Sequence, residues 1–254
     1  MIETEILSDK AAVGQAAADC GAEAIRRALE QRGSANIVVA TGASQFETMA
    51  ALVARNDLNW SRVTAFHLDE YIGMSDSHPA SFRRYLKERF TSHLPTLGAF
   101  HFVEGDLPHL AAELSRLNSL MATHPVDVTF AGIGENAHLA FNDPPADFAA
   151  DEAFKVVALD DRCRQQQFGE GWFESLDAVP REAISMTVRQ IMRSALVVLA
   201  VPDRRKAEAV RATLQDPISP AVPASILREH PACRLFLDHE SAVLLEKPEA
   251  TPIG

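Results

Sequence analysis

The sequence is poor in cysteine: its 254 residues contain only Cys20, Cys163 and Cys233. An odd number of cysteines without CxxC spacing argues against a disulfide framework and is typical of the reducing cytosol, so we expect a cytoplasmic protein. The chain does not open with a basic segment followed by an apolar one, and no apolar run reaches the roughly 18 residues that span a bilayer. We therefore expect neither a signal peptide nor a membrane partner.

Positive charge is also scarce. Lysine and arginine total 24 against 35 aspartates and glutamates, which gives a formal net charge of −11. Proteins that bind nucleic acids need a basic surface that displaces counterions from phosphates, so we expect no nucleic-acid partner. A phosphorylated metabolite is still compatible with this composition, because one small anion requires only a local positive pocket.

Apolar runs alternate with amphipathic segments along the chain, and this alternation predicts an α/β fold. The expected strands cover 37–40, 63–68, 127–132, 154–159, 183–188, 195–201 and 233–237. Helices are expected at 10–32, from a capping box formed by Ser44 and Glu47, from Pro79 to about Phe90, at 108–122 and at 203–214. The pattern predicts one mostly parallel sheet with helices on both faces, in a single domain over 1–254.

The turn Thr41-Gly42-Ala43-Ser44 lies between a predicted strand and a predicted helix. Backbone N–H groups at such a helix start point outward and stabilise a bound phosphate, although an ordinary βα turn has the same local sequence. Ligands of parallel sheets bind at the carboxyl ends of the strands. We therefore expect this turn to share one site with the loops that follow the other strands.

Asp69 and Glu70 directly follow the predicted strand 63–68. A carboxylate held rigidly there and partly desolvated suits a general base, and the plain alternative is a solvated strand end. Neighbouring side chains of an extended segment point in opposite directions, so we expect separate roles for the two carboxylates.

The segment from Gly132 to Pro144 is dense in polar groups. A histidine whose ring is oriented by a carboxylate can move a proton near neutral pH, and His138 with Asp143 fits that description. Asn136 is a candidate to orient either the imidazole or a sugar hydroxyl. The alternative is a buried histidine that hydrogen-bonds only to the backbone.

Arg204, Arg205 and Lys206 form a basic run at a predicted helix start. Cations oppose the helix dipole there, so they are either a second contact to a phosphate or a solvated charge run. His138 and Asp143 have no second histidine at metal-ligand spacing. His67, Asp69 and Glu70 lie on or beside one strand, where neighbouring side chains face opposite sides, so the three cannot converge on one ion. We therefore expect no metal site.

Taken together, these segments resemble the glucosamine-6-phosphate deaminases over nearly the whole chain. The resemblance rests on Thr41-Gly42-Ala43-Ser44, on Leu68-Asp69-Glu70-Tyr71 with His78-Pro79-x-Ser81, on Gly132-x-Gly134-x-Asn136-x-His138-x-Ala140-Phe141-Asn142-Asp143-Pro144, and on Pro223-Ala224-Ser225-Ile226-Leu227 through His230. It implies an open Rossmann-like sheet and a sugar-phosphate substrate, without any cofactor. A homo-oligomer is compatible with it.

The resemblance also implies roles for individual residues. Asp69 is expected to move a proton between C2 and C1 of the sugar, and His138 to catalyse ring opening, oriented by Asn136 and Asp143. The expected contacts to the substrate and its phosphate are Thr41, Gly42, Ala43, Ser44, Glu70 and Lys206.

Two positions depart from the family pattern. Asp143 stands where the family usually has Glu, and the shorter arm leaves its carboxylate further from His138 unless the loop moves in. Gln167 stands where a phosphate-binding Arg is expected, and Arg162, Arg164 and Arg189 are candidates to replace it. No match to the allosteric residues of regulated members is found, so we expect no activation by an acetylated amino sugar.

Three alternatives stay open: a galactosamine-6-phosphate deaminase, a 6-phosphogluconolactonase of the same fold, and a sugar-phosphate sensor without activity. The lactonases typically carry Asp-Glu-Arg and Asp-Gly-His-Thr-Ala-Ser where this chain has Asp69-Glu70-Tyr71 and Asn136-Ala137-His138-Leu139-Ala140-Phe141, which favours a deaminase. The segment 144–180 is a candidate lid over the site.

Overall fold

The computed structural model describes residues 2–245, so residue 1 and residues 246–254 of the expected domain lie outside the described part. Its centre is a seven-stranded sheet in which every neighbouring pair of strands is parallel. The strand order is β1 (Ile2–Leu7), β10 (Cys233–Asp238), β9 (Leu196–Val201), β6 (Val128–Ala131), β2 (Ala35–Val39), β3 (Val63–His67) and β5 (Ala99–His101). The prediction of a mostly parallel α/β sheet is confirmed.

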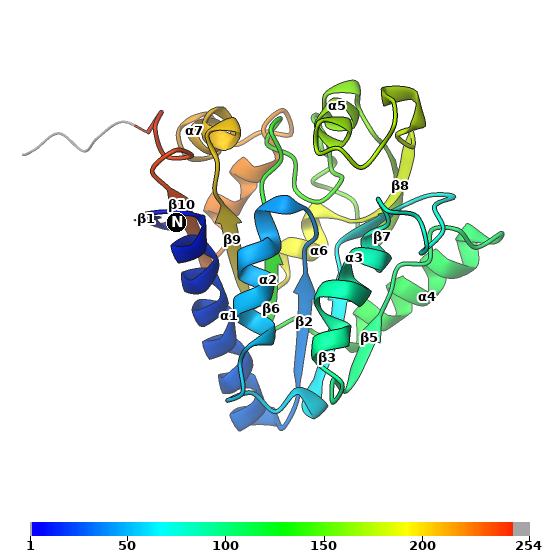
Figure 1. Ribbon diagram of the computed structural model, residues 1–254, viewed down its shortest axis with the longest axis vertical. Coiled ribbons are helices and arrows are strands. Elements are labelled where there is room, and N and C mark those ends of the chain that lie inside the picture. Colours follow the sequence, from blue (N-terminus) through cyan, green and yellow to red (C-terminus); the bar gives the residue numbers. More distant parts are fainter. Residues whose placement is uncertain (1, 246–254) are drawn as a thin grey trace, which may run out of the picture.

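Helices cover both faces of this sheet (Figure 1). Alternate strand residues enter different cores: Ile37 and Val39 pack with α1 (Lys10–Arg32) and α2 (Phe46–Val53), whereas Val38 faces the core of α4 (Leu110–Thr123), α6 (Val188–Met192) and α7 (Ala207–Gln215). This alternation follows from the two-residue period of a strand. The central strands are apolar on both faces because both faces are covered.

A second, three-stranded antiparallel sheet contains β4 (Asp69–Tyr71), β8 (Glu182–Met186) and β7 (Phe154–Ala158). The strands near 154–159 and 183–188 therefore exist as expected, but they belong to this second sheet: β8 pairs with β4, the extension of β3 beyond Leu68, and β7 pairs with β8. This pairing fixes Asp69 and Glu70 in extended backbone just past the end of a central strand. The residues of β4 are all buried.

Two expected helix starts are wrong. The helix after β3 does not begin at Pro79: α3 (Phe82–Arg89) begins after Ser81, whose side chain accepts the N–H of Arg84. The capping box of Ser44 and Glu47 does not form either, since Ala43–Gln45 is a 3₁₀ turn without a side-chain cap and α2 starts at Phe46. The Ser44 hydroxyl instead accepts a hydrogen bond from the Gln45 amide.

Four further elements were not expected: the edge strands β1 and β5, and the helices α5 (Asp161–Gly169) and α6. The basic run at 204–206 forms a 3₁₀ turn before α7, and Pro223–Glu229 is also 3₁₀. None of the helices within 2–245 is long and apolar enough to cross a membrane.

Candidate active site

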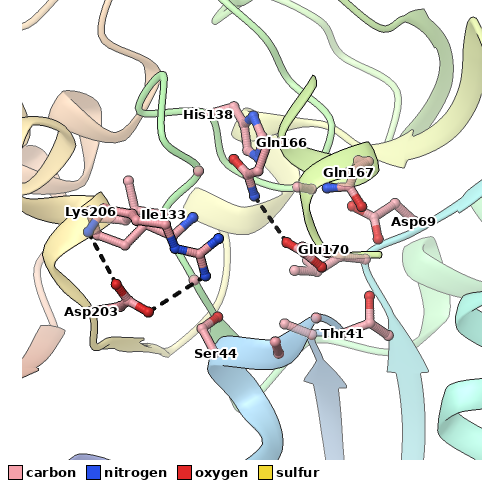
Figure 2. A pocket seen from close by; sticks show the side chains of 18 of the residues that line it. Thr41, Ser44, Asp69, Ile133, His138, Gln166, Gln167, Glu170, Asp203 and Lys206 are labelled. Atoms are coloured by element: carbon pink, nitrogen blue, oxygen red, sulfur yellow. Dashed lines mark hydrogen bonds and ion pairs between the residues drawn. The ribbon is translucent and has the colours of Figure 1, made fainter. Parts of the chain in front are cut away.

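A cavity lies at the carboxyl ends of β2, β3, β6 and β9 (Figure 2). Seven of the ten predicted site residues line it: Thr41, Gly42, Ala43, Ser44, Asp69, His138 and Lys206. The cavity is also lined by Lys10, Gln166, Glu170 and Asp203, which were not predicted as site residues. It is lined as well by Arg205, which was considered only as part of the basic run, and by Gln167, which was considered only as the position of a missing arginine. The loops that were expected to share one site therefore do meet at one rim of the sheet.

The turn after β2 requires glycine at its centre. Gly42 has φ 101° and ψ 162°, which an L residue adopts only with strain. Its carbonyl accepts the N–H of Gln45 and closes the 3₁₀ turn. The backbone of this turn thereby forms the floor of the cavity, with Ser44 at its edge in Figure 2.

Asp69 is buried with only 6% of its surface exposed, and its carboxyl has no hydrogen bond or ion pair with any residue in 2–245. Burial raises its pKa well above the ordinary value, and the neighbouring carboxylate of Glu70 raises it further. An unpaired, desolvated carboxylate that faces a cavity is a reactive base, because nothing in the protein stabilises its charge.

Glu70 points away from the cavity and does not line it. Its carboxylate accepts hydrogen bonds from the Ser81 hydroxyl at 2.8 Å and from the backbone N–H groups of Tyr71, Phe82 and Arg83 at 3.0, 3.3 and 2.9 Å. Burial raises the pKa of Glu70, although these donors oppose the shift. This residue therefore fixes the start of α3, and the two neighbouring carboxylates have different surroundings, as expected.

His138 and Asp143 form a hydrogen-bonded pair. Nδ1 of His138 lies 2.9 Å from Oδ1 of Asp143, so the shorter arm of aspartate still reaches the ring. Burial favours a higher pKa for Asp143, but the hydrogen bonds from His138, Asp160 and Asn136 outweigh it and the pKa is lowered. An ionised Asp143 places the proton on Nδ1 and leaves Nε2 as the free acceptor.

Asn136 hydrogen-bonds to both residues of this pair. Its side-chain carbonyl accepts the N–H of His138 at 3.1 Å, and its amide donates to Asp143 at 3.1 Å and to Asp160 at 3.2 Å. Asp160 in turn donates its N–H to Asp143 and caps α5 through the N–H of Cys163. Neither Asn136 nor Asp143 lines the cavity, and both contact His138, which does.

Lys206 is the buried cation of the cavity, only 7% exposed. Its ammonium has no hydrogen bond or ion pair with the described residues. Burial lowers its pKa, and the nearby Glu135 and Glu170 oppose that shift. An unpartnered, buried donor at the end of a cavity is suited to an anionic ligand.

Helix α5 supplies Gln166 and Gln167 to the opposite wall, and Glu170 follows directly after its end. Gln167 accepts a hydrogen bond from the hydroxyl of Tyr71 at 2.8 Å, which fixes its orientation. The segment 144–180 thus contributes directly to the site, and its closing movement stays a prediction. Sequence reasoning missed these residues because no strand end or motif precedes them.

None of the three arginines expected to replace the one missing at Gln167 lines the cavity. Arg164 is buried and donates to the carbonyls of Leu176 and Val179, and Arg189 pairs with Asp151. Arg162 is exposed. The cations that do line the cavity together with Lys206 are Lys10 and Arg205.

Only one group of potential metal ligands lies close together within 2–245: His138, Asp143 and Cys163, with ligand atoms within 4.8 Å. The nitrogen of His138 that faces Asp143 is already engaged by it. Burial raises the pKa of Cys163 strongly, which disfavours the thiolate that a metal requires. The surroundings thus favour a hydrogen-bonded network, and the lack of a resident metal stays a prediction.

Comparison with known proteins identifies the same family. A glucosamine-6-phosphate deaminase of Oenococcus oeni is 30% identical over 246 residues, which cover 97% of this chain and all of that protein. One from Streptococcus pneumoniae is 34% identical over 215 residues, covering 85% of this chain and 89% of the relative.

Solved structures agree in fold. A monomeric glucosamine-6-phosphate deaminase superposes with a TM-score of 0.86 at 29% identity, covering 96% of this chain and 100% of that one. A 6-phosphogluconolactonase of Shewanella baltica gives 0.78 at 16% identity, covering 94% and 97%, and shows the fold alone. The family model for glucosamine-6-phosphate isomerases/6-phosphogluconolactonase matches residues 8–235, so the chain belongs to that family.

Proposed function

We propose that this protein is a glucosamine-6-phosphate deaminase, which converts glucosamine 6-phosphate and water to fructose 6-phosphate and ammonia. The observation that carries the proposal is that Asp69, His138 and Lys206 line one cavity. An unpaired base, an oriented imidazole and an unpartnered cation match the three needs of the reaction: proton abstraction at carbon, ring opening and phosphate binding. None of these steps requires a cofactor.

Ring opening is the first step. The O1 hydroxyl loses its proton, the C1–O5 bond breaks, C1 becomes an aldehyde and O5 is protonated. His138 is placed for both proton transfers, because Asp143 holds Nδ1 and leaves Nε2 free to accept a proton and return it. Asp143 stabilises the imidazolium that forms in between.

Isomerisation and deamination follow. Asp69 removes the proton from C2 while the aldehyde oxygen O1 takes up a proton, which gives an enolamine between C1 and C2. Asp69 then returns its proton to C1 as the amine nitrogen releases one, so that overall one proton moves from nitrogen to O1. The resulting C2 imine adds water and releases ammonia, leaving the ketone of fructose 6-phosphate. Because burial raises the pKa of Asp69, the carboxylate is a stronger base than an exposed one.

The phosphate is remote from the reacting carbons. We assign it to the Thr41–Ser44 turn and Lys206, which line the cavity together and can offer backbone N–H groups and an ammonium to an anion. Binding energy at that end positions the open chain between Asp69 and His138, which lowers the entropy loss in the transition state.

Three alternatives are separated by one assay. Purified protein is incubated separately with glucosamine 6-phosphate, galactosamine 6-phosphate and 6-phosphogluconolactone, while ammonia, ketose phosphate and hydrolysis of the lactone are measured. We expect both products from the first sugar. Activity with galactosamine 6-phosphate alone would identify that epimer as the substrate. Hydrolysis of 6-phosphogluconolactone without ammonia release from either sugar would show a lactonase, and binding without turnover would show a sensor.

A further inference from the structure

Lys10, Asp203 and Arg205 meet at the cationic end of the cavity although Lys10 is nearly two hundred residues away in sequence. Nζ of Lys10 lies 3.2 Å from Oδ2 of Asp203, and Nη2 of Arg205 lies 3.5 Å from the same oxygen. All three residues line the cavity, and Figure 2 shows Asp203 on the same side of it as Lys206. Two cations from different elements are thus held by one carboxylate.

Asp203 is itself held rigidly. Its backbone has φ 92°, in the range that L residues rarely adopt. Its N–H donates to both carboxylate oxygens of Asp238 at 3.0 and 3.1 Å, and its own carboxylate accepts the N–H of Arg205 at 3.2 Å. Strained residues persist where their surroundings fix them and are often found at functional sites. The turn therefore presents the Arg205 side chain at a defined place.

The charges at this end suit a phosphate. Lys10, Arg205 and Asp203 together carry one net positive charge, and the unpartnered Lys206 adds a second. A phosphate monoester carries about −1.5 to −2 at neutral pH. Two acids oppose this balance: Glu135 lies 3.7 Å from Arg205, and Glu170 lines the cavity. The Arg205 side chain is half exposed, and its contact with Glu135 is long, so a bound phosphate would compete with Glu135 for the guanidinium.

The position where the family resemblance predicts an arginine carries the neutral Gln167, which is bonded to Tyr71. We propose that Lys10 and Arg205, held by Asp203, supply the phosphate contact that this position lacks. The proposal rests on the proposed function in that the ligand is a sugar phosphate. Of the three cations at 204–206, it assigns a phosphate contact to Arg205 and Lys206 and none to Arg204.

Arg205→Gln and Lys10→Gln, singly and together, test this inference, and Arg204→Gln is the matched control. Arg204 is exposed, pairs with Glu240 at 3.4 Å and does not line the cavity. We expect Arg205→Gln to weaken binding of inorganic phosphate and to raise KM for glucosamine 6-phosphate about tenfold, within the range of a lost charge-assisted hydrogen bond. The exposed Lys10 should give a smaller effect and the double variant a larger one, with kcat nearly unchanged.

Phosphate affinity is measured by calorimetry, and thermal unfolding verifies that each variant is folded. Equal phosphate affinity in Arg205→Gln and Arg204→Gln would overturn the inference. Phosphate binding requires no turnover, so the two proposals fail separately. If the wild type releases no ammonia, but Arg205→Gln binds phosphate more weakly than the wild type, only the proposed deaminase activity is refuted. An active wild type whose phosphate affinity and KM are insensitive to residues 10 and 205 refutes only the phosphate contact.

Discussion

The imidazole of His138 and the carboxylate of Asp143 are in direct hydrogen-bond contact, at 2.9 Å, although an aspartate is one methylene shorter than the family's usual glutamate. Asp143 also accepts the backbone N–H of Asp160 at 2.9 Å, which helps to hold its carboxylate in this position. Asp143 itself does not line the cavity. In the proposed reaction it therefore acts by orienting the ring and by stabilising its charged form.

We expect Asp143→Asn to lower kcat about 10²-fold or more and to leave KM nearly unchanged, because an amide neither stabilises the imidazolium nor fixes the tautomer. Steady-state kinetics with glucosamine 6-phosphate measures both values. Asp143→Glu is the matched control and should retain much more activity than the amide. A kcat in Asp143→Asn equal to that of wild type would remove the carboxylate from ring opening.

Asp69 gives a kinetic prediction. Asp69→Asn should abolish ammonia and ketose release while leaving binding of the sugar phosphate largely intact, because the amide keeps the shape and loses the base. The acidic limb of the kcat/KM profile of the wild type should lie well above pH 4, since burial and Glu70 raise the pKa of this carboxyl. Residual turnover in Asp69→Asn would assign the proton transfer to another group.

The Asp69→Asn substitution, which should abolish activity, is expected to increase the stability of the fold. The folded-state pKa of Asp69 is above its unfolded value of about 3.9. Between these two values the folded state retains a proton that the unfolded state releases, so the stability that protonation supports is lost as pH rises through the folded pKa. Asp69→Asn avoids the buried charge, so we expect its free energy of unfolding to exceed that of wild type at pH 7. Denaturant melts should show the difference vanish below about pH 4.

Gly134 gives a test of how closely the backbone approaches His138. A Cβ at position 134 would overlap the ring atoms Nε2, Cδ2 and Cε1 of His138. We expect Gly134→Ala to displace the ring and to lower kcat by about 10²-fold, with a loss of stability of about 1–3 kcal/mol from overpacking. Gly169→Ala is the control, because a Cβ there meets nothing within 4 Å. Similar kinetics in the two variants would contradict the placement of the ring.

The sequence allowed the central sheet to be predicted because its strands are buried on both faces and appear as short apolar runs, such as Ile37 to Ala40. The edge strand β1 was missed since most of its residues, including Glu3 and Glu5, are exposed and leave no such run. The start of α3 was misplaced because Pro79 is a local signal. The actual start depends on Glu70, a tertiary contact.

The candidate site was predicted to the extent that its residues follow strands. Thr41, Asp69 and His138 follow three different strands, and parallel topology brings these ends together. Lys10 and Gln166 belong to helices whose approach to the rim depends on packing across the whole chain, so no local pattern marked them. The outward direction of Glu70 was also not readable, because it depends on which side of β4 faces the cavity.

Substitution of Glu70 tests whether this carboxylate stabilises the fold or contacts the substrate. Glu70→Gln places an amide donor against the hydroxyl of Ser81 and the N–H of Arg83, and it removes the charge that faces the Arg83 guanidinium at 3.5 Å. Breaking such a buried pair typically destabilises a protein by about 3–5 kcal/mol. We therefore expect a clear fall in the free energy of unfolding and only a small change in KM of the protein that remains folded.

The matched control for this prediction is Glu104→Gln. Glu104 also pairs with Arg83, at 3.7 Å, but its side chain is 45% exposed, so we expect little change in stability. Chemical denaturation and steady-state kinetics on both variants distinguish the two roles. A large rise in KM for Glu70→Gln without loss of stability would show that the carboxylate contacts the substrate after all, and that the start of α3 is held by other groups.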